Sequence, residues 1–296
     1  MIACHNGRYN GVYLILAAFL TMSIPSHCPA VPIPSVGLSG GLEGFHLKEI
    51  DSSGTRLLSE TGRRYVATAF LDDSDKYEFK TPLLYHLEAS TYWGQVDYEG
   101  MSQSITPGQN NLPLLSQTDY LGGRAEAMVG YRFMLPNHSS AIELLGGMGV
   151  DGWKRRIHSA VASDGTAVSG IEERYTAYYG KIALGLSNLY PSGWYSHLQF
   201  GVKIPVDIIE YVYLSKVGYD NDLTLNPGNT LSGFVDLQFE SSHSDKAGNP
   251  VFRIYYDAFR FDPSAAKSAN RGTSTDHVWQ PETRIDIFGL QIGYRF

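Results

Sequence analysis

The stretch Ile287–Phe296, IFGLQIGYRF, repeats an apolar side chain at every second position and closes on an aromatic ring. These apolar residues are Phe288, Leu290, Ile292, Tyr294 and Phe296. The residues between them are small or polar, apart from Ile287. A period of two puts alternate side chains on opposite faces of a β-strand, whereas a helix would need a period of 3.6. The stretch therefore predicts a strand with one wholly apolar face.

The first thirty residues have the three parts of a secretory signal peptide. Arg8 supplies the positive charge, Val12–Leu20 is an apolar run, and small residues and prolines lead to Ala30. Such a run is too short to be a good transmembrane helix. We expect cleavage after Ala30, so that residues 1–30 are removed and residues 31–296 form one domain.

Cleavage at this site would remove both cysteines, Cys4 and Cys28. His27 beside Cys28 argues against a lipid anchor there. Neither a disulfide framework nor a thiolate metal site is then expected, and no metal or cofactor is predicted. The remaining chain would hold 22 basic and 30 acidic side chains without a basic patch. Nucleic acid is therefore not an expected partner.

Alternation like that of the last ten residues recurs along the chain, which is 12% aromatic and contains 20 tyrosines and 31 glycines. Clear examples are Leu83–Ala89, Leu121–Phe133, Leu198–Ile204 and Leu231–Phe239. Short and long connections alternate between such segments. Short turns cover 72–76, 135–140, 188–193 and 242–249, and long loops cover 51–62, 96–118, 157–170, 208–229 and 262–281. This combination is typical of a transmembrane barrel.

We therefore predict an all-β fold, a transmembrane antiparallel up-and-down β-barrel of about ten strands, with eight or twelve as alternatives. Phe45 and Leu47 are out of phase with Leu38 and Leu42, so we expect a bulge near Gly44. The expected strands are 36–50, 62–72, 77–95, 119–133, 141–155, 171–187, 194–207, 230–241, 250–261 and 282–296.

Aromatic residues gather near the expected strand ends, where rings can form a girdle at each membrane surface. At the short-turn ends they are Tyr77, Phe79, Tyr131, Phe133, Trp194, Phe239, Phe252, Tyr294 and Phe296. At the long-loop ends the candidates are Tyr92, Trp93, Trp153, Tyr175, Tyr211, Tyr213 and Trp279.

The signal segment and the closing strand together resemble those of Gram-negative outer-membrane β-barrel proteins. The terminal Phe296, with apolar residues at every second position before it, is similar to the recognition signal of the barrel assembly machinery. The resemblance implies location in the cell outer membrane after signal-directed export. It also implies contact with outer-membrane lipid and lipopolysaccharide, and with the assembly machinery during biogenesis. The partner of the loops is not indicated.

Charged residues of both signs fall on the face that we expect to line the lumen. The candidates are Arg124, Glu126, Arg132, Glu143, Lys203, Asp236, Glu240, Arg253 and Asp257. Because a ten-strand barrel is narrow, these groups either pair into a plug or border a thin path for ions. The corresponding functions are a structural or surface-interaction barrel and a small porin-like channel.

An enzyme is the alternative, because omptin-type outer-membrane proteases are also ten-stranded barrels and use aspartates and a histidine at the outer rim. Candidate rim residues are Asp151, His158, Asp220, Asp222, Asp276 and His277, without an omptin-like motif around them. A lipase using Ser159 with His158 is disfavoured, since neighbours in a strand face opposite ways. Finally, the run Trp153–Arg156 has three cations that could bind lipopolysaccharide phosphates or form a solvated rim.

Overall fold

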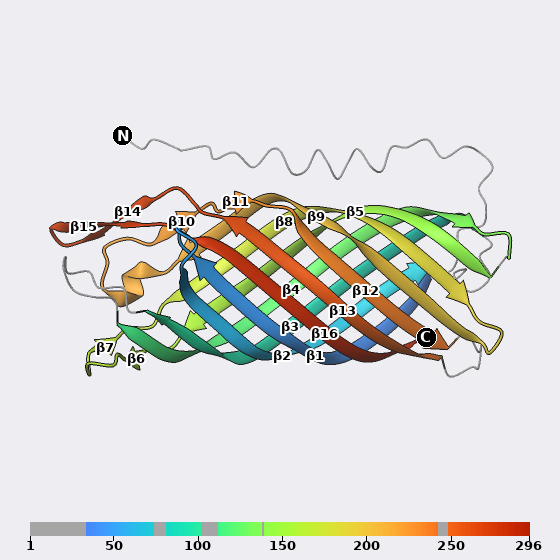
Figure 1. Cartoon of the computed structure of the whole chain (residues 1–296), viewed down its shortest axis with the longest axis horizontal. Helices are drawn as coiled ribbons and strands as arrows, with labels where there is room; N and C mark the ends of the chain where they lie inside the picture. Colours follow the sequence, from blue (N-terminus) through green and yellow to red (C-terminus); the bar gives the residue numbers. More distant parts are fainter. Residues whose placement is uncertain (1–33, 74–80, 102–111, 138, 242–247) are drawn as a thin grey trace, which may run out of the picture. The chain divides into compact units, whose positions relative to one another are not determined.

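A computed structural model describes residues 34–73, 81–101, 112–137, 139–241 and 248–296. The expected signal peptide, 1–30, lies outside these ranges. Within them, ten long strands form an antiparallel sheet that closes on itself (Figure 1). Each strand pairs with its neighbours in the chain, so the predicted up-and-down barrel of ten strands is confirmed. Among the residues described, no helix is long and apolar enough to cross a membrane.

The ten barrel strands are β1 (Pro34–Ile50), β2 (Arg56–Asp73), β3 (Leu83–Met101), β4 (Pro113–Met134), β5 (Ser140–Ile157), β8 (Glu172–Leu189), β9 (Trp194–Val212), β12 (Ser232–Ser241), β13 (Asn249–Asp262) and β16 (Glu282–Arg295). Seven of the ten barrel strands are longer than the sequence suggested, whereas β3 has the predicted length and β12 and β16 are slightly shorter. The loops add β6 (Ala160–Val161), β7 (Ala167–Val168), the 3-10 turn η2 (Leu214–Val217), β10 (Leu223–Leu225), β11 (Gly228–Asn229), β14 (Lys267–Arg271) and β15 (Ser274–Val278).

The closing strand pairs with the first strand over almost its whole length, from Gly37 opposite Arg295 to Ile50 opposite Glu282. The expected bulge near Gly44 is wrong, because the register of β1 is continuous there on both sides. Phe45 and Leu47 lie inside the barrel and are each only 3% exposed. Their odd-numbered positions share the inward face of β1 with Glu43 and Glu49, so no bulge is needed to bury them.

The outer surface of the barrel carries a broad band without charge. On β4 the outward side chains from Phe133 to Leu121 are apolar or glycine, and the next outward residue is Asp119. The apolar face of the closing strand, Phe288, Leu290, Ile292 and Tyr294, also points outward, as does the terminal Phe296. Beyond the band the strands continue towards the long loops, but their outer face becomes polar. Apolar and polar residues no longer alternate there, which explains why most of the predicted strands stopped short of their long-loop ends.

The expected aromatic girdle is present at the short-turn end, where Tyr131, Phe133, Trp194, Phe239 and Phe252 face outward. Tyr77 and Phe79 lie outside the described residues.

At the other border the assignment was partly wrong. Trp93 faces outward, but Tyr92, Trp153 and Tyr175 point inside and are 2–6% exposed. Their rings fill the interior at the long-loop end of the barrel, which we call the upper interior. The outward rings at this border that the sequence analysis did not assign are Tyr65, Tyr178 and Tyr256.

The seam between β1 and β16 should tolerate side chains on one face only. A Cβ at Gly41 would lie 1.9 Å from the carbonyl oxygen of Leu290, whereas a Cβ at Gly40 would have its nearest neighbour, the carbonyl oxygen of Val66, at 3.7 Å. We expect Gly41→Val to cost at least the ~1–3 kcal/mol typical of overpacking, and to lower the fraction of heat-modifiable, folded protein on gels. Gly40→Val is the matched control, and an equal loss in both variants would contradict the seam geometry.

Candidate functional site

The interior of the barrel is the candidate site, because that is where charged residues gather. The side chains of all nine lumen candidates point inward. Arg124, Glu126, Lys203 and Asp257 lie at the centre, and the other five lie towards the short-turn end. They come from β4, β5, β9, β12 and β13, so bonds between them cross the lumen as well as neighbouring strands.

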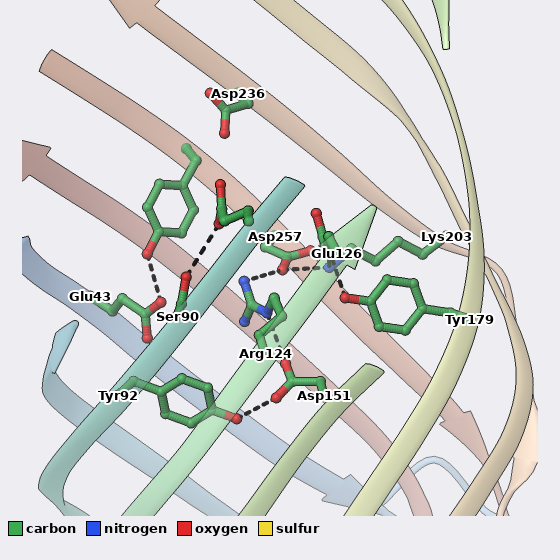
Figure 2. A network of polar contacts seen from close by, with 12 residues as sticks. Glu43, Ser90, Tyr92, Arg124, Glu126, Asp151, Tyr179, Lys203, Asp236 and Asp257 are labelled. Atoms are coloured by element: carbon green, nitrogen blue, oxygen red, sulfur yellow. Dashed lines mark hydrogen bonds and ion pairs between the residues drawn. The ribbon is translucent and has the colours of Figure 1, made fainter. Parts of the chain in front are cut away.

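At the centre, the guanidinium of Arg124 binds one carboxylate from the neighbouring strand and one from across the lumen (Figure 2). Its Nε lies 3.0 Å from Asp151 on β5, and its Nη1 lies 3.0 Å from Asp257 on β13. The hydroxyl of Tyr92 donates to Asp151 at 2.6 Å. One cation therefore links opposite walls of the barrel.

Two lysines complete the central network. Lys203 Nζ lies 2.6 Å from Asp257 and 3.6 Å from Glu126, as Figure 2 shows in part. Lys181 Nζ lies 2.6 Å from Glu126, which also accepts a hydrogen bond from the Tyr179 hydroxyl at 2.7 Å. With Arg124 and Asp151, the network holds three cations and three carboxylates. Such a balance is what a confined, poorly hydrated space requires.

A separate pair joins β1 to β2. Arg64 Nη2 lies 2.6 Å from Glu43, and the Tyr255 hydroxyl donates to the same carboxylate at 2.6 Å. The guanidinium carbon is 4.3 Å from the ring centroids of both Phe45 and Tyr92. Burial between two aromatic faces suits a planar, weakly hydrated cation.

Nearer the long loops, Arg155 is held by three carboxylates. The nitrogen-to-oxygen distances are 3.0 Å to Glu49, 2.9 Å to Glu60 and 2.7 Å to Glu173. Arg155 is 1% exposed, and its partners come from β1, β2 and β8. Because the carboxylates outnumber the cation, the arginine is essential to this cluster.

Aromatic and aliphatic side chains pack around these charges and fill the upper interior. Trp153 stacks on Tyr175 with centroids 4.9 Å apart and lies 6.2 Å from Phe261. This buried cluster draws side chains from nine of the ten barrel strands. The interior is therefore packed across its width at this level.

The short-turn half is more polar and contains a cavity of about 70 Å³, lined in part by His86 and His197. Around it, Arg253 lies 2.6 Å from both Glu88 and Asp236. Further pairs are Arg132 with Glu143 at 3.0 Å, Arg295 with Asp72 and Glu240 at 2.5 Å each, and His197 with Glu143 at 3.0 Å. In the ranges described, no group of His, Cys, Asp or Glu side chains could hold a metal ion.

Sequence reasoning missed much of the interior near the long loops. The buried charges that it did not assign to the lumen include Glu43, Glu49, Glu60, Arg64, Arg155, Glu173 and Glu210. For Glu43 and Glu49 the signal was the unbroken odd-numbered phase of β1, in which Phe45 lies between them. Apolar and charged residues share that face, so it does not look like a conventional polar lumen.

The rim residues considered for hydrolysis do not form one site. Asp151 lies in the central network, and His158 Nε2 lies 2.7 Å from Asp119. Ser159 accepts a hydrogen bond from the N–H of Gly170 at 3.0 Å. Among the described residues, no hydrogen bond or ion pair joins any two of the six candidate acids and histidines.

Asp220 and Asp276 hold two long loops together, whereas Asp222 is bonded within one of them. Asp220 accepts from the N–H of Gly272 at 2.9 Å, and Asp276 accepts from the Tyr219 hydroxyl at 3.0 Å. The N–H of Ser215 holds the pKa of the Asp222 carboxyl below its usual value. A small apolar cluster lies beneath these bonds, formed by Val212, Leu214, Leu223, Leu225 and Ala269.

The Arg155 cluster should dominate the stability of the upper interior. Arg155→Met would leave three buried carboxylates without their cation, and we expect a loss of about 3–5 kcal/mol in the free energy of unfolding. The control is Arg56→Met, which breaks an exposed pair with Glu99 and should cost at most about 1 kcal/mol. Denaturant unfolding of both variants in detergent measures the difference, and equal losses would contradict the role given to burial.

Comparisons with known proteins show a likeness in fold alone. No protein-family model matches the chain, and no curated protein matches it. Among solved structures, the outer membrane protease OmpT from Escherichia coli aligns with a TM-score of 0.60 at 10% identity, covering 89% of this chain and 96% of that one. The translocator domain of autotransporter NalP from Neisseria meningitidis aligns with a TM-score of 0.41 at 10% identity, covering 96% of each chain.

A third structure, the toluene transporter TodX from Pseudomonas putida, aligns with a TM-score of 0.38 at 7% identity, covering 90% of each chain. The functions in these names differ, so they do not select one for this chain. The likeness to OmpT, the closed ten-strand sheet and the uncharged outer band agree with one another. The chain has the fold of bacterial outer-membrane β-barrel proteins.

Proposed function

We propose that this protein is a non-conducting barrel, a structural and surface-interaction protein of the outer membrane and not an open channel. The observation that carries the proposal is the occluded interior. The central network spans the lumen, and above it the aromatic cluster joins nine strands. An ion crossing the barrel would have to break buried ion pairs and displace packed rings.

The long loops support a role at the surface. Two of them, between β9 and β12 and between β13 and β16, are bonded to each other and share an apolar cluster. The β14–β15 hairpin extends from this end of the barrel (Figure 1). Loops that are already folded present a fixed surface to a partner, which lowers the entropy cost of binding.

The enzyme alternative rests on one feature, the His158–Asp119 pair. A carboxylate that orients an imidazole is the usual arrangement of a general base. Among the residues that the structure describes, no hydroxyl is hydrogen-bonded to the His158 ring, and Ser159, its chain neighbour, instead accepts from the N–H of Gly170. The shared fold with a protease does not supply the missing group.

Planar-bilayer recording tests the closed lumen. We expect no discrete conductance steps from the purified protein, and no ion flux in liposomes that contain it. A heat-modifiable band on a gel shows that the reconstituted protein is folded. An absence of conductance would then not be caused by misfolded protein. Reproducible single-channel steps from folded wild-type protein would favour the porin-like channel instead.

Hydrolysis assays test the alternative. We expect no cleavage of peptide or ester substrates above the rate of a preparation without the protein. Cleavage that disappears in His158→Ala or Asp119→Asn, but persists in Asp276→Ala and His277→Ala, would instead identify the His158–Asp119 pair as a catalytic base.

A further inference from the structure

Four glutamates meet around one arginine inside the barrel at its long-loop end. The arginine is Arg155 on β5, and the glutamates are Glu49 on β1, Glu60 on β2, Glu173 on β8 and Glu210 on β9. None of the five residues is more than 8% exposed. We call them the four-glutamate cluster. Among the described residues, Arg155 is the only cation that forms an ion pair with any of these glutamates.

The cluster lies beyond the uncharged band, where water surrounds the wall. Arg156 on β5 and Arg174 on β8 face outward at this level, and both are exposed. Inside, Glu49 and Glu173 keep 6% and 8% of their surface exposed. Protons can therefore exchange between the cluster and the water at the long-loop end.

The charges within the cluster do not balance. Arg155 Nη2 lies 2.9 Å from Glu60, and the hydroxyl of Tyr120 donates to the same carboxylate. Arg155 Nη1 lies 3.0 Å from Glu49 and 2.7 Å from Glu173, but it shares the same single charge with them. One guanidinium balances one carboxylate. A buried carboxylate without its own cation takes up a proton, because burial disfavours the charged form.

The contacts of one hydroxyl indicate where a proton is held. The Tyr175 oxygen lies 2.9 Å from Glu210 Oε1 and 3.2 Å from Glu173 Oε2. A phenol has a single hydrogen, so it can donate to only one of the two carboxyl groups. The other contact is a hydrogen bond only if that carboxyl group is protonated and donates to the phenol oxygen. Glu173 is paired with Arg155, whereas Glu210 has no ion pair among the described residues, so the proton belongs to Glu210.

The second oxygen of Glu210 supports this assignment. Glu210 Oε2 is buried and has no hydrogen-bond partner in the part of the chain that the structure describes. A carboxylate spreads its negative charge over both oxygens, whereas a protonated acid leaves a neutral carbonyl there, which costs less to bury unpaired. Burial raises the pKa of the Glu210 carboxyl well above its usual value, and the charge of Glu173 raises it further. Burial also raises the pKa of Glu49 to about 7, although Arg155 opposes the rise.

The other groups that face the cluster add no positive charge. Three phenols border it, and burial raises the pKa of Tyr98 to about 12 and the pKa values of Tyr120 and Tyr175 well above their usual range. On β16, the direct partner of Glu49 is the uncharged Thr283. Within the described residues, the positive charge that complements Arg155 is therefore carried by protons.

We propose that the four-glutamate cluster is a proton-binding site that couples the pH of the medium to the packing of the upper interior. Glu210 and Glu49 hold the protons, and Glu60 is the ionised partner of Arg155. Loss of the protons leaves repelling carboxylates on β1, β8 and β9 with one cation between them, so these parts of the wall separate and water enters. The long-loop end of the barrel is thus packed most tightly in acidic medium. The inference concerns the interior alone and does not depend on a partner of the loops.

The stability of the barrel should record these protons. A glutamate of the unfolded chain has a pKa of about 4.3, so above that pH the folded cluster holds protons that the unfolded chain has lost. Each such proton raises the unfolding constant by up to about tenfold per pH unit, until the pH passes the pKa in the folded protein. The stability that the cluster contributes therefore falls as the pH rises from about 5 to about 8.

Urea titration of the folded protein in detergent measures the unfolding constants of the wild type, Glu210→Gln and Glu49→Gln. Glutamine has the shape of the protonated acid, and at position 210 its amide can donate to the Tyr175 oxygen as the acid does. The ratio of the wild-type constant to the Glu210→Gln constant should rise at least about tenfold from about pH 5 to about pH 8, with a smaller rise for Glu49→Gln. At the higher pH both variants should be at least as stable as the wild type.

Glu99→Gln is the matched control, because Glu99 is an exposed glutamate of β3 whose partner Arg56 is also exposed. Its ratio should change by less than about twofold over the same range, as expected for an exposed pair.

Infrared spectra of the folded protein give a second measurement that needs no unfolding. The carbonyl band of protonated carboxylic acids should be present in the wild type at neutral pH and smaller in each of the two cluster variants, but unchanged in Glu99→Gln. Either cluster variant is sufficient if the other does not give the heat-modifiable band. A ratio of unfolding constants that does not change with pH, an equal change in Glu99→Gln, a loss of stability in both cluster variants at the higher pH, or an undiminished carbonyl band would overturn the proposal.

Discussion

The constraint on which the structure depends is that no backbone N–H or C=O can remain unpaired inside a bilayer. Closure of β16 on β1 meets this constraint, because fourteen consecutive pairs join the first strand to the last. Closure in turn creates an interior that must be filled. With ten strands, that interior is narrow enough for side chains to meet across it, so whatever sequence lines the inner face has to be complementary to itself.

The interior is filled in two different ways along the axis of the barrel. Near the short turns the inner face is polar, and charged pairs surround a small cavity. Near the long loops the same barrel is filled like a soluble protein core, with stacked rings enclosing Arg64 and Arg155. Replacing a whole buried ion pair by apolar residues is often neutral for stability, although removing one partner alone is costly. The clearer effect of these pairs is on register, because a slip by one residue would turn Arg124 and Asp257 towards lipid.

This division of the interior explains which parts of the fold could be predicted from the sequence and which could not. In the lipid-facing half the outer face is uniformly apolar, so the phase of β4 and β16 could be assigned from alternation alone, and nine lumen-facing charges were identified with it. In the upper half both faces are mixed, since water touches the outside and rings fill the inside. There the phase of Phe45 was interpreted as a sign of a bulge, and Trp153 was interpreted as a girdle residue, although both belong to the core.

The contacts of Arg155 also restrict the stage of assembly at which the interior of the barrel can lose its water. Glu49 and Glu60 lie about a hundred positions before it in the chain, and Glu173 lies on the far side of a long loop. Glu173 is the direct partner of Arg155 on the neighbouring strand, but Glu49 and Glu60 cannot reach Arg155 until β1 and β2 have curled round to face β5. A half-assembled sheet therefore keeps a wet inner surface, which opposes insertion with that face towards lipid and makes dehydration of the interior one of the last events of biogenesis.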